Sequence, residues 1–367
     1  MRAGHPWFFK EGGPLPPPGT LVELLDRDDV VAWGLADEGT IAVRVLGRQK
    51  APKGPLEQVV GERIRRADAV RTRLIDPLTD AYRVISSAGD GLPDVIVDRY
   101  GSLAVLRLYA SAWLPHLEHL VAAIKGLPWV QTVAWRKGVV RVDGGQGLEV
   151  LHGPAPADLI VVSEGDMKMP MRPYVGQKTG LFLDQRAHRA MIRRLSSGRI
   201  VANLFSYNGG FSVAAALGGA AHVTTVDIAP DAIEDAKLAF ELNGLDPLDH
   251  TFQAADVFKW KPPGKVDLLI VDPPALARES RSDDAAVRAY RKLHSRLGPF
   301  VPRDGLLATS SCTARLSLED WQRVIAEALS RSGDWSWHHI SAEPVDHPVA
   351  IAHTEAHYLK FALLRRR

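Results

Sequence analysis

The stretch RIVANLFSYNGGFSVAAALGGA, residues 199–220, decides the fold class of this chain. It predicts an apolar strand, a glycine-containing loop (203–212) and a helix of small residues. Gly209 and Gly210 would let the loop backbone approach a ligand closely, and the N-terminus of the helix favours a negative charge there. The loop lacks the GxGxxG spacing, and glycine-rich strand–helix turns are also common as structural features. This stretch alone therefore leaves ligand binding open.

A second strand, HVTTVD (222–227), ends in Asp227, about 20 residues beyond the glycine loop, where doubly wound sheets grip a ribose diol. Asp227 could instead cap the helix predicted over 230–244, but we favour ribose binding because the loop and the acid occur together. A third strand over 250–258 carries an acid that could accept a hydrogen bond from an adenine amino group. The residues predicted to contact the cofactor here are Phe205, Ser206, Tyr207, Asn208, Gly209, Gly210, Asp227, Ile228, Asp256 and Val257.

The fourth strand, VDLLIVDPP (266–274), ends in Asp272-Pro273-Pro274. The prolines make the chain leave the sheet in extended geometry, at the carboxyl edge where open α/β sheets bind ligands. A dehydrogenase rarely has Asp-Pro-Pro there, whereas methyltransferases that act on a nitrogenous base often carry Asn/Asp-Pro-Pro. We therefore predict S-adenosylmethionine (SAM) as the cofactor, with Asp272 beside it and the two prolines against the substrate.

The single cysteine follows the fifth predicted strand, LLATSS, within DGLLATSSCTARLS (304–317). A lone cysteine is more often a small buried hydrophobe. At the end of a strand that neighbours the Asp-Pro-Pro turn, however, Cys312 would face the same pocket as Asp272, which favours a nucleophile. A thiolate that adds to C6 of cytosine makes C5 reactive toward a methyl group. Methylation of an amino group needs no thiol, so Cys312 indicates methylation at carbon.

Composition excludes several other classes of protein. The chain has 367 residues and one cysteine, so an internal disulfide and any Cys-rich zinc or iron–sulfur site are excluded, and we predict no metal site. Hydrophobic residues make up 46% and charged residues 24%, which are ordinary globular values. No apolar run is long enough for a membrane span, and MRAGHPWFFKEGG lacks the apolar region of a signal peptide. We expect a cytoplasmic protein without membrane contact.

The chain divides into zones of different pattern. Short alternating strands indicate a small all-β module over 1–50, and a basic helix follows within 51–76. Mixed α/β patterns fill 77–163, and alternating strands and helices over 164–367 predict an open parallel sheet. Between 44 and 73, nine basic residues face three acidic ones, which fits either a nucleic-acid contact or an ordinary solvated helix.

Together these motifs resemble those of the bacterial large-subunit rRNA cytosine-C5 methyltransferases of the RlmI/RlmO type. GDGLPDVIVDRYG (89–101) resembles the central domain of that family, and GHPWFF (4–9) resembles the start of its N-terminal PUA domain. The resemblance covers essentially the whole chain and is most specific from 164 to 367. The motifs that carry it there are GQKTGLFLDQR (176–186), NLFSYNGGFS (203–212), VDPP (271–274), SSCT (310–313), DHPV (346–349) and YLK (358–360).

The resemblance implies a PUA-like RNA-binding β-barrel, a central α/β domain and a Rossmann-like class I methyltransferase domain that binds SAM. It implies Cys312 as the nucleophile and Asp272 as its partner at the base. We place His347 among the substrate-binding residues, although shaping the loop between the last strands is the favoured role for it. It also makes segment 176–186 a wall of the SAM pocket, although from the residues alone an ordinary domain connection explains that segment equally well. The pocket residues carried over from the family are Lys178, Thr179, Asp184, Gln185 and Arg186.

The chain departs from the family pattern in three ways. It begins almost at GHPW, so the β-module is short and its RNA binding is less certain. The Asp-Pro-Pro turn continues as Ala-Leu-Ala, where relatives usually carry Lys-Phe. There is no second cysteine to help release the product, so Asp272, His347 or a bound water must take that part.

The resulting hypothesis is SAM-dependent methylation of cytosine C5 in RNA, namely 23S rRNA or a ribosome-assembly intermediate. The target base must be unpaired or flipped out of its helix to reach a thiol at a sheet edge. One alternative is a SAM-dependent rRNA guanine methyltransferase, and another is a non-enzymatic RNA-binding module. A homodimer is also left open.

Overall fold

A computed structural model describes residues 4–10, 12–138, 145–175, 180–276, 283–314 and 316–367. The chain divides into two compact units, each made of several segments. The division into domains over 1–50, 51–76, 77–163 and 164–367 stays a prediction. The first unit comprises Met1–Asp166, Met171–Leu183 and Pro344–Ala356, and the second unit comprises Met167–Pro170, Asp184–Glu343 and His357–Arg367.

The N-terminal sheet of the first unit is antiparallel, with the strand order β1-β4-β3-β2. Its strands are β1 (Trp7–Phe9), β2 (Leu21–Asp26), β3 (Asp29–Ala36) and β4 (Ile41–Arg48). The short strands expected over 1–50 are present, and exposed and half-buried residues alternate along β2. The identity of this sheet as a PUA-like barrel stays a prediction.

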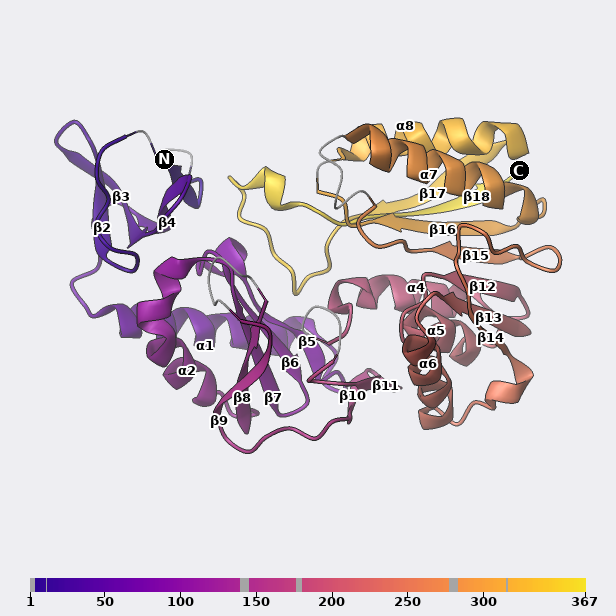
Figure 1. Cartoon of the computed structure of the whole chain (residues 1–367), viewed down its shortest axis with the longest axis horizontal. Coiled ribbons are helices and arrows are strands. Elements are labelled where there is room, and N and C mark those ends of the chain that lie inside the picture. Colours follow the sequence, from indigo (N-terminus) through magenta and orange to yellow (C-terminus); the bar gives the residue numbers. More distant parts are fainter. Residues whose placement is uncertain (1–3, 11, 139–144, 176–179, 277–282, 315) are drawn as a thin grey trace. The chain divides into compact units, whose positions relative to one another are not determined.

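The rest of the first unit packs two helices against a mixed sheet (Figure 1). The helices are α1 (Leu56–Leu74) and α2 (Leu117–Lys125), and their apolar faces share a core with Val97, Leu106 and Trp113. The strands are β5 (Ala81–Ser86), β6 (Val95–Tyr100), β7 (Leu103–Leu108), β8 (Thr132–Lys137) and β9 (Gly147–His152), and only β7 and β8 run parallel.

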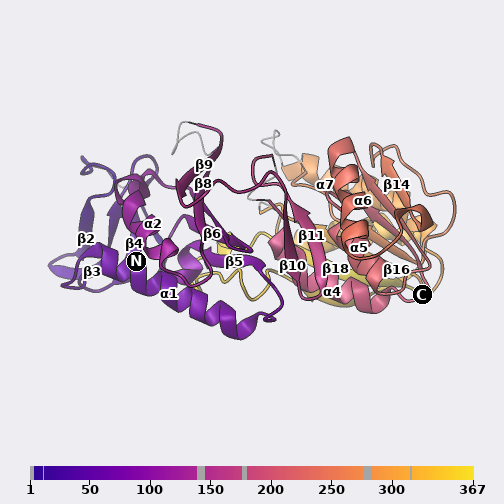
Figure 2. The same cartoon turned by 90° about the horizontal axis from the view of Figure 1, so that it is seen from below.

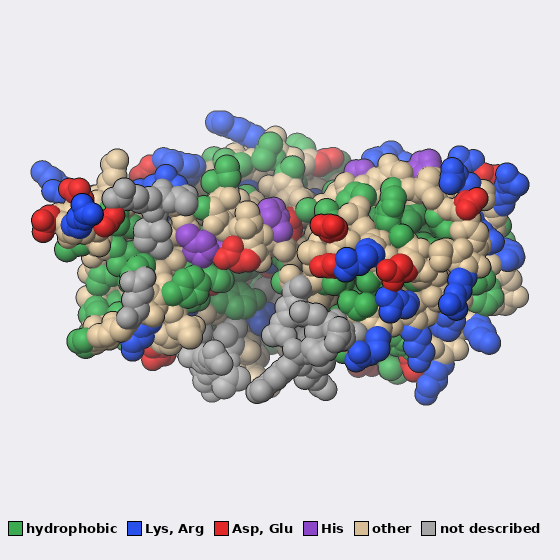
Figure 3. Space-filling model, turned by 90° about the horizontal axis from the view of Figure 1, so that it is seen from above, with side chains coloured by type: hydrophobic (Ala, Val, Ile, Leu, Met, Phe, Trp, Pro, Cys, Tyr) green, Lys and Arg blue, Asp and Glu red, His purple; other side chains and the backbone are tan. Residues whose placement is uncertain are grey.

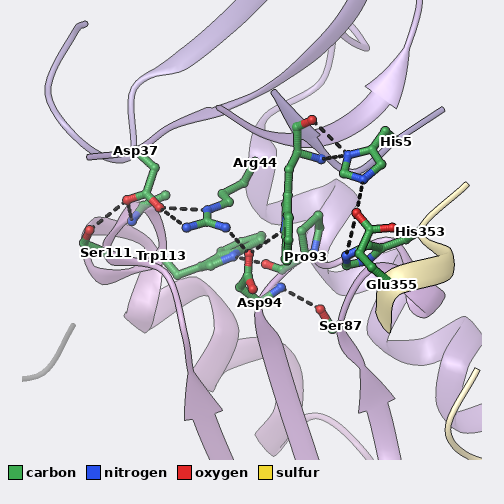
Figure 4. A network of polar contacts seen from close by, with 12 residues as sticks. His5, Asp37, Arg44, Ser87, Pro93, Asp94, Ser111, Trp113, His353 and Glu355 are labelled. Carbon is green, nitrogen blue, oxygen red and sulfur yellow. Dashed lines mark hydrogen bonds and ion pairs between the residues drawn. The ribbon is translucent and has the colours of Figure 1, made fainter. Parts of the chain in front are cut away.

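Two of the nine basic residues between 44 and 73, Arg44 and Arg71, are buried inside the first unit, and Arg63 is half-buried. Arg44 forms ion pairs at 2.7 Å with both Asp37 and Asp94, in the network of Figure 4. Arg71 is only 2% exposed and forms an ion pair with Asp90. Arg63 donates hydrogen bonds to two backbone carbonyls. These side chains hold the unit together, and the two buried arginines cannot contact RNA, so fewer positive charges of this stretch remain for a ligand than the sequence indicates.

The second unit is built on a seven-stranded sheet with the order β14-β13-β12-β15-β16-β18-β17. All neighbouring pairs from β14 to β16 are parallel, and β18 runs antiparallel to both of its neighbours. The strands are β12 (Ile200–Leu204), β13 (His222–Asp227), β14 (Thr251–Ala254), β15 (Leu268–Val271), β16 (Leu306–Ser311), β17 (Trp335–Ser341) and β18 (Lys360–Arg366). The predicted parallel sheet is confirmed.

Helices cover both faces of this sheet, α7 and α8 on one face and α4, α5 and α6 on the other (Figure 1; Figure 2). Their bounds are α4 (Arg186–Leu195), α5 (Gly210–Leu217), α6 (Pro230–Leu242), α7 (Asp283–Leu297) and α8 (Leu318–Leu329). Local signals fix their starts: Pro230 opens α6, and the Ser317 hydroxyl accepts a hydrogen bond from the Asp320 amide at 3.0 Å to cap α8. Because helices lie on both sides, every residue of β15 and β16 is buried.

The strand order places a ligand site at one point of the sheet. The chain moves outward from β12 through β13 to β14, then returns to the other side of β12 with β15 and β16. In such open sheets the crevice for a ligand forms at the carboxyl ends of the strands, where the order reverses. The strands β10 (Ile160–Glu164) and β11 (Met167–Met171) lie where the chain passes between the units. None of the helices in the described part of the chain has the length and apolar character needed to cross a membrane.

Candidate active site

The loop after β12 has an unusual backbone. Phe205 and Tyr207 have φ angles of 59° and 49°, in the left-handed region that side chains other than glycine rarely adopt. The Ser206 amide donates to the carbonyl of Val226 at 3.0 Å, which ties the loop to the end of β13. Strain of this kind persists where the surroundings fix it, and it gathers at ligand sites.

Packing explains the two glycines of this loop. Gly209 has a φ of 79°, and a Cβ there would lie 2.8 Å from the Cβ of Ala236 in α6. A Cβ on Gly210 would lie 3.0 Å from the side chain of Arg189 in α4. The glycines therefore let α5 approach its neighbouring helices. This is the structural alternative that the sequence left open, and it stands beside any contact with a ligand.

Asp227 holds the loop and the start of the next helix together. Its carboxylate accepts hydrogen bonds from the backbone amides of Tyr207 at 2.8 Å and Ala229 at 3.0 Å, one on each oxygen. Each oxygen keeps a second lone pair, so the group could also accept from a diol. The side chain of Ile228, directly after it, is 70% exposed and offers an apolar surface at the same edge.

The other predicted cofactor residues lie at or near this edge. Asp256 lies two residues beyond β14 and accepts a hydrogen bond from the Phe258 amide at 2.9 Å, and Val257 is buried. Phe205 packs edge-on against Phe258, with 5.9 Å between the ring centres. Asn208 is buried and donates to the carbonyl of Pro170.

Asp272 directly follows β15 and accepts two side-chain hydrogen bonds. The amide of Gln185 donates to its Oδ1 at 3.0 Å, and the hydroxyl of Ser310 in β16 donates to the same oxygen. Pro273 after it is buried, whereas Pro274 is exposed. The carboxylate is thus fixed by residues from two other elements, the turn before α4 and the adjacent strand.

The buried side chain of His188 contacts Gln185. His188 Nδ1 lies 2.5 Å from the Gln185 side-chain oxygen, and its Nε2 lies 2.9 Å from the hydroxyl of Ser341. Its ring stacks on Phe361 with 3.9 Å between the centres. Burial, aided by the charge of Arg189, lowers the pKa of His188 to about 3, so this histidine stays neutral and positions Gln185.

Cys312 follows β16 and is partly exposed. It lies two residues beyond Ser310, whose hydroxyl donates to Asp272. Burial raises the pKa of Tyr290 in α7, and the nearby charges of Cys312 and Asp272 act in the same direction. The charges of Cys312 and Asp272 thus both act on the buried Tyr290 hydroxyl.

Lys360 brings a buried positive charge to this edge. It is only 6% exposed and pairs with Ser311 in the register of β16 and β18. Its Nζ donates to the carbonyls of Thr313 at 3.0 Å and Tyr358 at 3.2 Å. Burial lowers the pKa of Lys360, while the nearby charges of Glu343 and Cys312 raise it. The charges of Lys360 and of a Cys312 thiolate therefore influence each other.

The remaining predicted residues are dispersed. Asp184 is buried and accepts a hydrogen bond from the Tyr358 hydroxyl at 2.7 Å, and Arg186 begins α4. His347 belongs to the first unit, where it is buried 3.3 Å from the carboxylate of Asp346. Lys178 and Thr179 lie outside the described residues.

Sequence reasoning missed four residues of this cluster: Ser310, His188, Tyr290 and Lys360. The YLK motif contained the lysine but gave it no role. The period-2 spacing of Ser310 and Cys312 in a strand that ends beside Asp272 was the available signal for the serine. For the other three there was none, because their contacts depend on how the helices and β18 pack.

Comparison with known proteins identifies the family. The model of the S-adenosylmethionine-dependent methyltransferases matches residues 141–322. A ribosomal RNA large subunit methyltransferase of Deinococcus radiodurans is 36% identical, with 100% of this chain and 94% of that protein aligned. The chain belongs to the ribosomal RNA large subunit methyltransferases. Another member of the family, ribosomal RNA large subunit methyltransferase I of Shewanella denitrificans, is 31% identical over 100% of this chain and 96% of its own length.

Solved structures agree with this fold. A methyltransferase complexed with SAH superimposes with a TM-score of 0.84 over 96% of this chain and 92% of its own, at 24% identity. A SAM-dependent methyltransferase from Streptococcus mutans gives 0.82 over 96% and 93%, also at 24% identity. This member of the rRNA large subunit methyltransferase family has the class I methyltransferase fold and uses SAM. The carboxylate of Asp227, with lone pairs left for a diol, and the exposed Ile228 fit that cofactor.

Proposed function

We propose that this enzyme methylates C5 of a cytosine in large-subunit rRNA, with Cys312 as the nucleophile and Asp272 at the target base. One observation carries the proposal. Asp272 and Cys312 follow β15 and β16, which are adjacent and parallel, so both leave the sheet at the same edge. Ser310, two residues before Cys312, is hydrogen-bonded to Asp272. A thiol and a carboxylate arranged in this way can contact the same planar base.

The chemistry follows from these two groups. The thiolate of Cys312 forms a bond to C6 while Asp272 hydrogen-bonds the N3/N4 edge and favours the N3-protonated ring, which makes C5 nucleophilic. SAM supplies the electrophilic methyl group that C5 takes up. H5 then leaves as a proton, the bond between sulfur and C6 breaks, and the N3 proton is released, which restores the aromatic ring and the thiolate. Asp272 and a bound water are the candidate acceptors of H5, whereas His347 belongs to the first unit.

Lys360 supplies the activation that the thiol needs. A cysteine thiol ordinarily has a pKa near 8.5, and a neighbouring cation lowers it. The Lys360 ammonium group is held by two backbone carbonyls, one of them that of Thr313, next to the nucleophile. Interaction between the two charges is reciprocal, so the thiolate that raises the pKa of Lys360 is itself stabilised by the lysine.

In this proposal the cofactor-binding residues contact different parts of SAM. Asp227 accepts hydrogen bonds from the ribose diol, Ile228 covers one face of the adenine, and Asp256 accepts from its amino group. The strained loop 205–210 passes beneath the cofactor. The turn at 184–186 forms a wall, and Gln185 there links the cofactor pocket to Asp272, to which it already donates at 3.0 Å.

The RNA substrate is proposed from the names of the relatives and from charge. Arg65, Arg66 and Arg73 are the exposed arginines of α1, although Arg66 also pairs with Glu62 at 2.6 Å. Figure 3 shows further Lys and Arg side chains on the surface of the unit that carries α7 and α8, where Arg288 and Lys292 are exposed. Contacts to phosphates through such groups weaken with salt. We further propose that the enzyme acts in the cytoplasm on rRNA or on an assembly intermediate.

Nucleoside mass spectrometry tests this function. Large-subunit rRNA that lacks the modification is incubated with SAM and either the wild-type protein or Cys312→Ser, and its nucleosides are then separated. We expect 5-methylcytidine from the wild-type protein and none from the variant. Methylguanosine would instead support the guanine methyltransferase alternative, and 5-methylcytidine at an undiminished rate from Cys312→Ser would overturn the covalent mechanism. SAM bound by both proteins, measured by calorimetry, shows that the variant is folded.

A further inference from the structure

Three potential metal ligands converge in the first unit (Figure 4). His5 Nε2 lies 2.6 Å from Oε1 of Glu355, and His353 Nε2 lies 4.0 Å from the same oxygen. One donor atom from each of the three residues lies within 4.8 Å of the others. His5 precedes β1, whereas the other two belong to the segment Pro344–Ala356.

The contacts of His5 allow two tautomers of its ring. Nδ1 lies 3.0 Å from the carbonyl oxygen of Trp7, to which it can donate, and 3.2 Å from the amide nitrogen of the same residue, from which it can accept. With the proton on Nδ1, Nε2 presents a lone pair to the Glu355 carboxylate at 2.6 Å, and a cation between the two groups would satisfy both; with the proton on Nε2, the ring donates directly to the carboxylate. Metal-binding histidines are commonly oriented by such a bond from the other ring nitrogen to a carbonyl.

His353 adds the third donor and is itself unsatisfied. The residue is 5% exposed, and its Nε2 is buried with no hydrogen-bond partner. A buried polar atom without a partner costs free energy, so a group that satisfies it is expected. The ring is held in place by Trp7, 4.4 Å away between centres, and the Trp7 indole donates to Asp94 at 3.2 Å.

We propose that His5, His353 and Glu355 bind one divalent transition-metal ion of the zinc class. Two imidazole nitrogens and one carboxylate oxygen are a donor set that Zn²⁺ prefers, with a fourth, open position for water. The ion would join the N-terminal strand to a segment some 350 residues later, so its effect is on the stability of the first unit. The site is independent of the proposed methylation chemistry. The single cysteine excludes only metal sites that are built from several cysteines. His5 lies far from the other two ligands in the sequence, so no local sequence pattern could predict the site.

Titration of the chelator-treated full-length protein with ZnCl₂ in excess Mg²⁺, followed by calorimetry, tests this site. We expect one Zn²⁺ per chain in the wild-type protein, and affinity lower by at least about 100-fold in His353→Gln and in Glu355→Gln. Glu355 is 53% exposed on its side chain, so its replacement leaves the fold intact. Zn²⁺ should also raise the melting temperature of the wild-type protein and leave that of the two variants unchanged.

Two control variants make the result specific. His357 pairs with Glu343 at 2.8 Å in the second unit, and no third ligand joins them among the described residues. His357→Gln and Cys312→Ser should therefore bind Zn²⁺ as the wild type does. The proposal is overturned if no event of one Zn²⁺ per chain occurs, if binding survives His353→Gln, or if either control abolishes it.

Discussion

At the scale of single residues, the proposed reactivity of Cys312 depends on Lys360, which strand pairing sets at the end of β16. Lys360 is the first residue of β18, and the antiparallel register sets it opposite Ser311, one residue before Cys312. Its buried ammonium group keeps two backbone hydrogen bonds, and the charge of Cys312 acts to raise the pKa of this lysine. Because this is the only cysteine of the chain, its ionisation can be measured directly in the intact protein.

We predict that Lys360→Gln raises the pKa of the Cys312 thiol. Without the neighbouring cation the thiolate is less stable, so iodoacetamide should alkylate the variant about tenfold more slowly at neutral pH. Rates measured from pH 6 to 10 should show the profile displaced to higher pH. Lys360→Arg keeps the charge and should restore much of the reactivity, and Lys259→Gln, at an exposed site in the same unit, should have no effect. Coincident profiles for wild type and Lys360→Gln would refute the role of this lysine.

A second residue-scale prediction concerns the cofactor. Asp227→Asn removes the charge that strengthens hydrogen bonds to the ribose diol, so affinity for SAM should fall by about 10- to 100-fold in calorimetric titrations. Asp231 lies four residues further on, in the exposed first turn of α6, and Asp231→Asn provides the matched control with unchanged affinity. Equal affinities for both variants would mean that Asp227 only organises the loop through its two backbone contacts.

At the scale of elements, the helices after β12 and β13 set the shape of the cofactor loop. α5 begins at a glycine pair because neighbouring helices come too close for any larger residue. The sequence pattern correctly predicted a strand, a loop and a helix here. It could not show that Gly209 faces Ala236, since that contact depends on how two helices pack.

We therefore expect Gly209→Ala to destabilise the protein more than a positive φ angle alone would. A Cβ in the left-handed region costs about 1 kcal/mol, and overpacking against Ala236 adds about 1–3 kcal/mol. Gly198 also has a positive φ, 69°, but its Cβ would meet nothing within 4 Å, so Gly198→Ala measures the backbone effect alone. Urea unfolding at pH 7 gives both values. Equal losses would show that helix packing at Gly209 is loose.

The sequence could predict those parts of the site that depend on strand order alone. Asp272 and Cys312 were expected at one edge because the carboxyl ends of parallel neighbours meet there, and β15 and β16 are neighbours. Gln185 was expected beside the cofactor, but its contact with Asp272 joins residues far apart in the chain. The same holds for Lys360, because β18 inserts between β16 and β17 in a direction that no local pattern specifies.

At the scale of the whole molecule, two buried neutral histidines couple stability to pH. Burial lowers the pKa of His188 to about 3 and that of His294 to about 4. In the unfolded chain both return to about 6.5, so below this pH the unfolded state binds more protons than the folded state. Stability is therefore fully present above pH 6.5 and decreases as the pH falls toward 4.

We predict that each histidine lowers the free energy of unfolding by roughly 2 kcal/mol between pH 6.5 and pH 5. His188→Gln can still form a hydrogen bond with Ser341, but it has no ring to protonate. Between pH 6.5 and pH 5 its free energy of unfolding should therefore fall by roughly 2 kcal/mol less than that of the wild type. Denaturant unfolding at several pH values, read for the transition of the second unit, supplies the measurement. Parallel pH dependence in both proteins would mean that His188 is protonated in the folded state.

The covalent attack of Cys312 on cytosine C6 is the central claim, and one trapping measurement tests it most directly. The protein is incubated with SAM and large-subunit rRNA that carries 5-fluorocytidine, from which the group at C5 cannot leave as a proton. The account predicts a covalent protein–RNA complex whose peptide map locates the link at Cys312, and no complex with Cys312→Ser. A wild-type protein that methylates unmodified rRNA at cytosine C5 but forms no adduct, or an adduct that persists in Cys312→Ser, would contradict it.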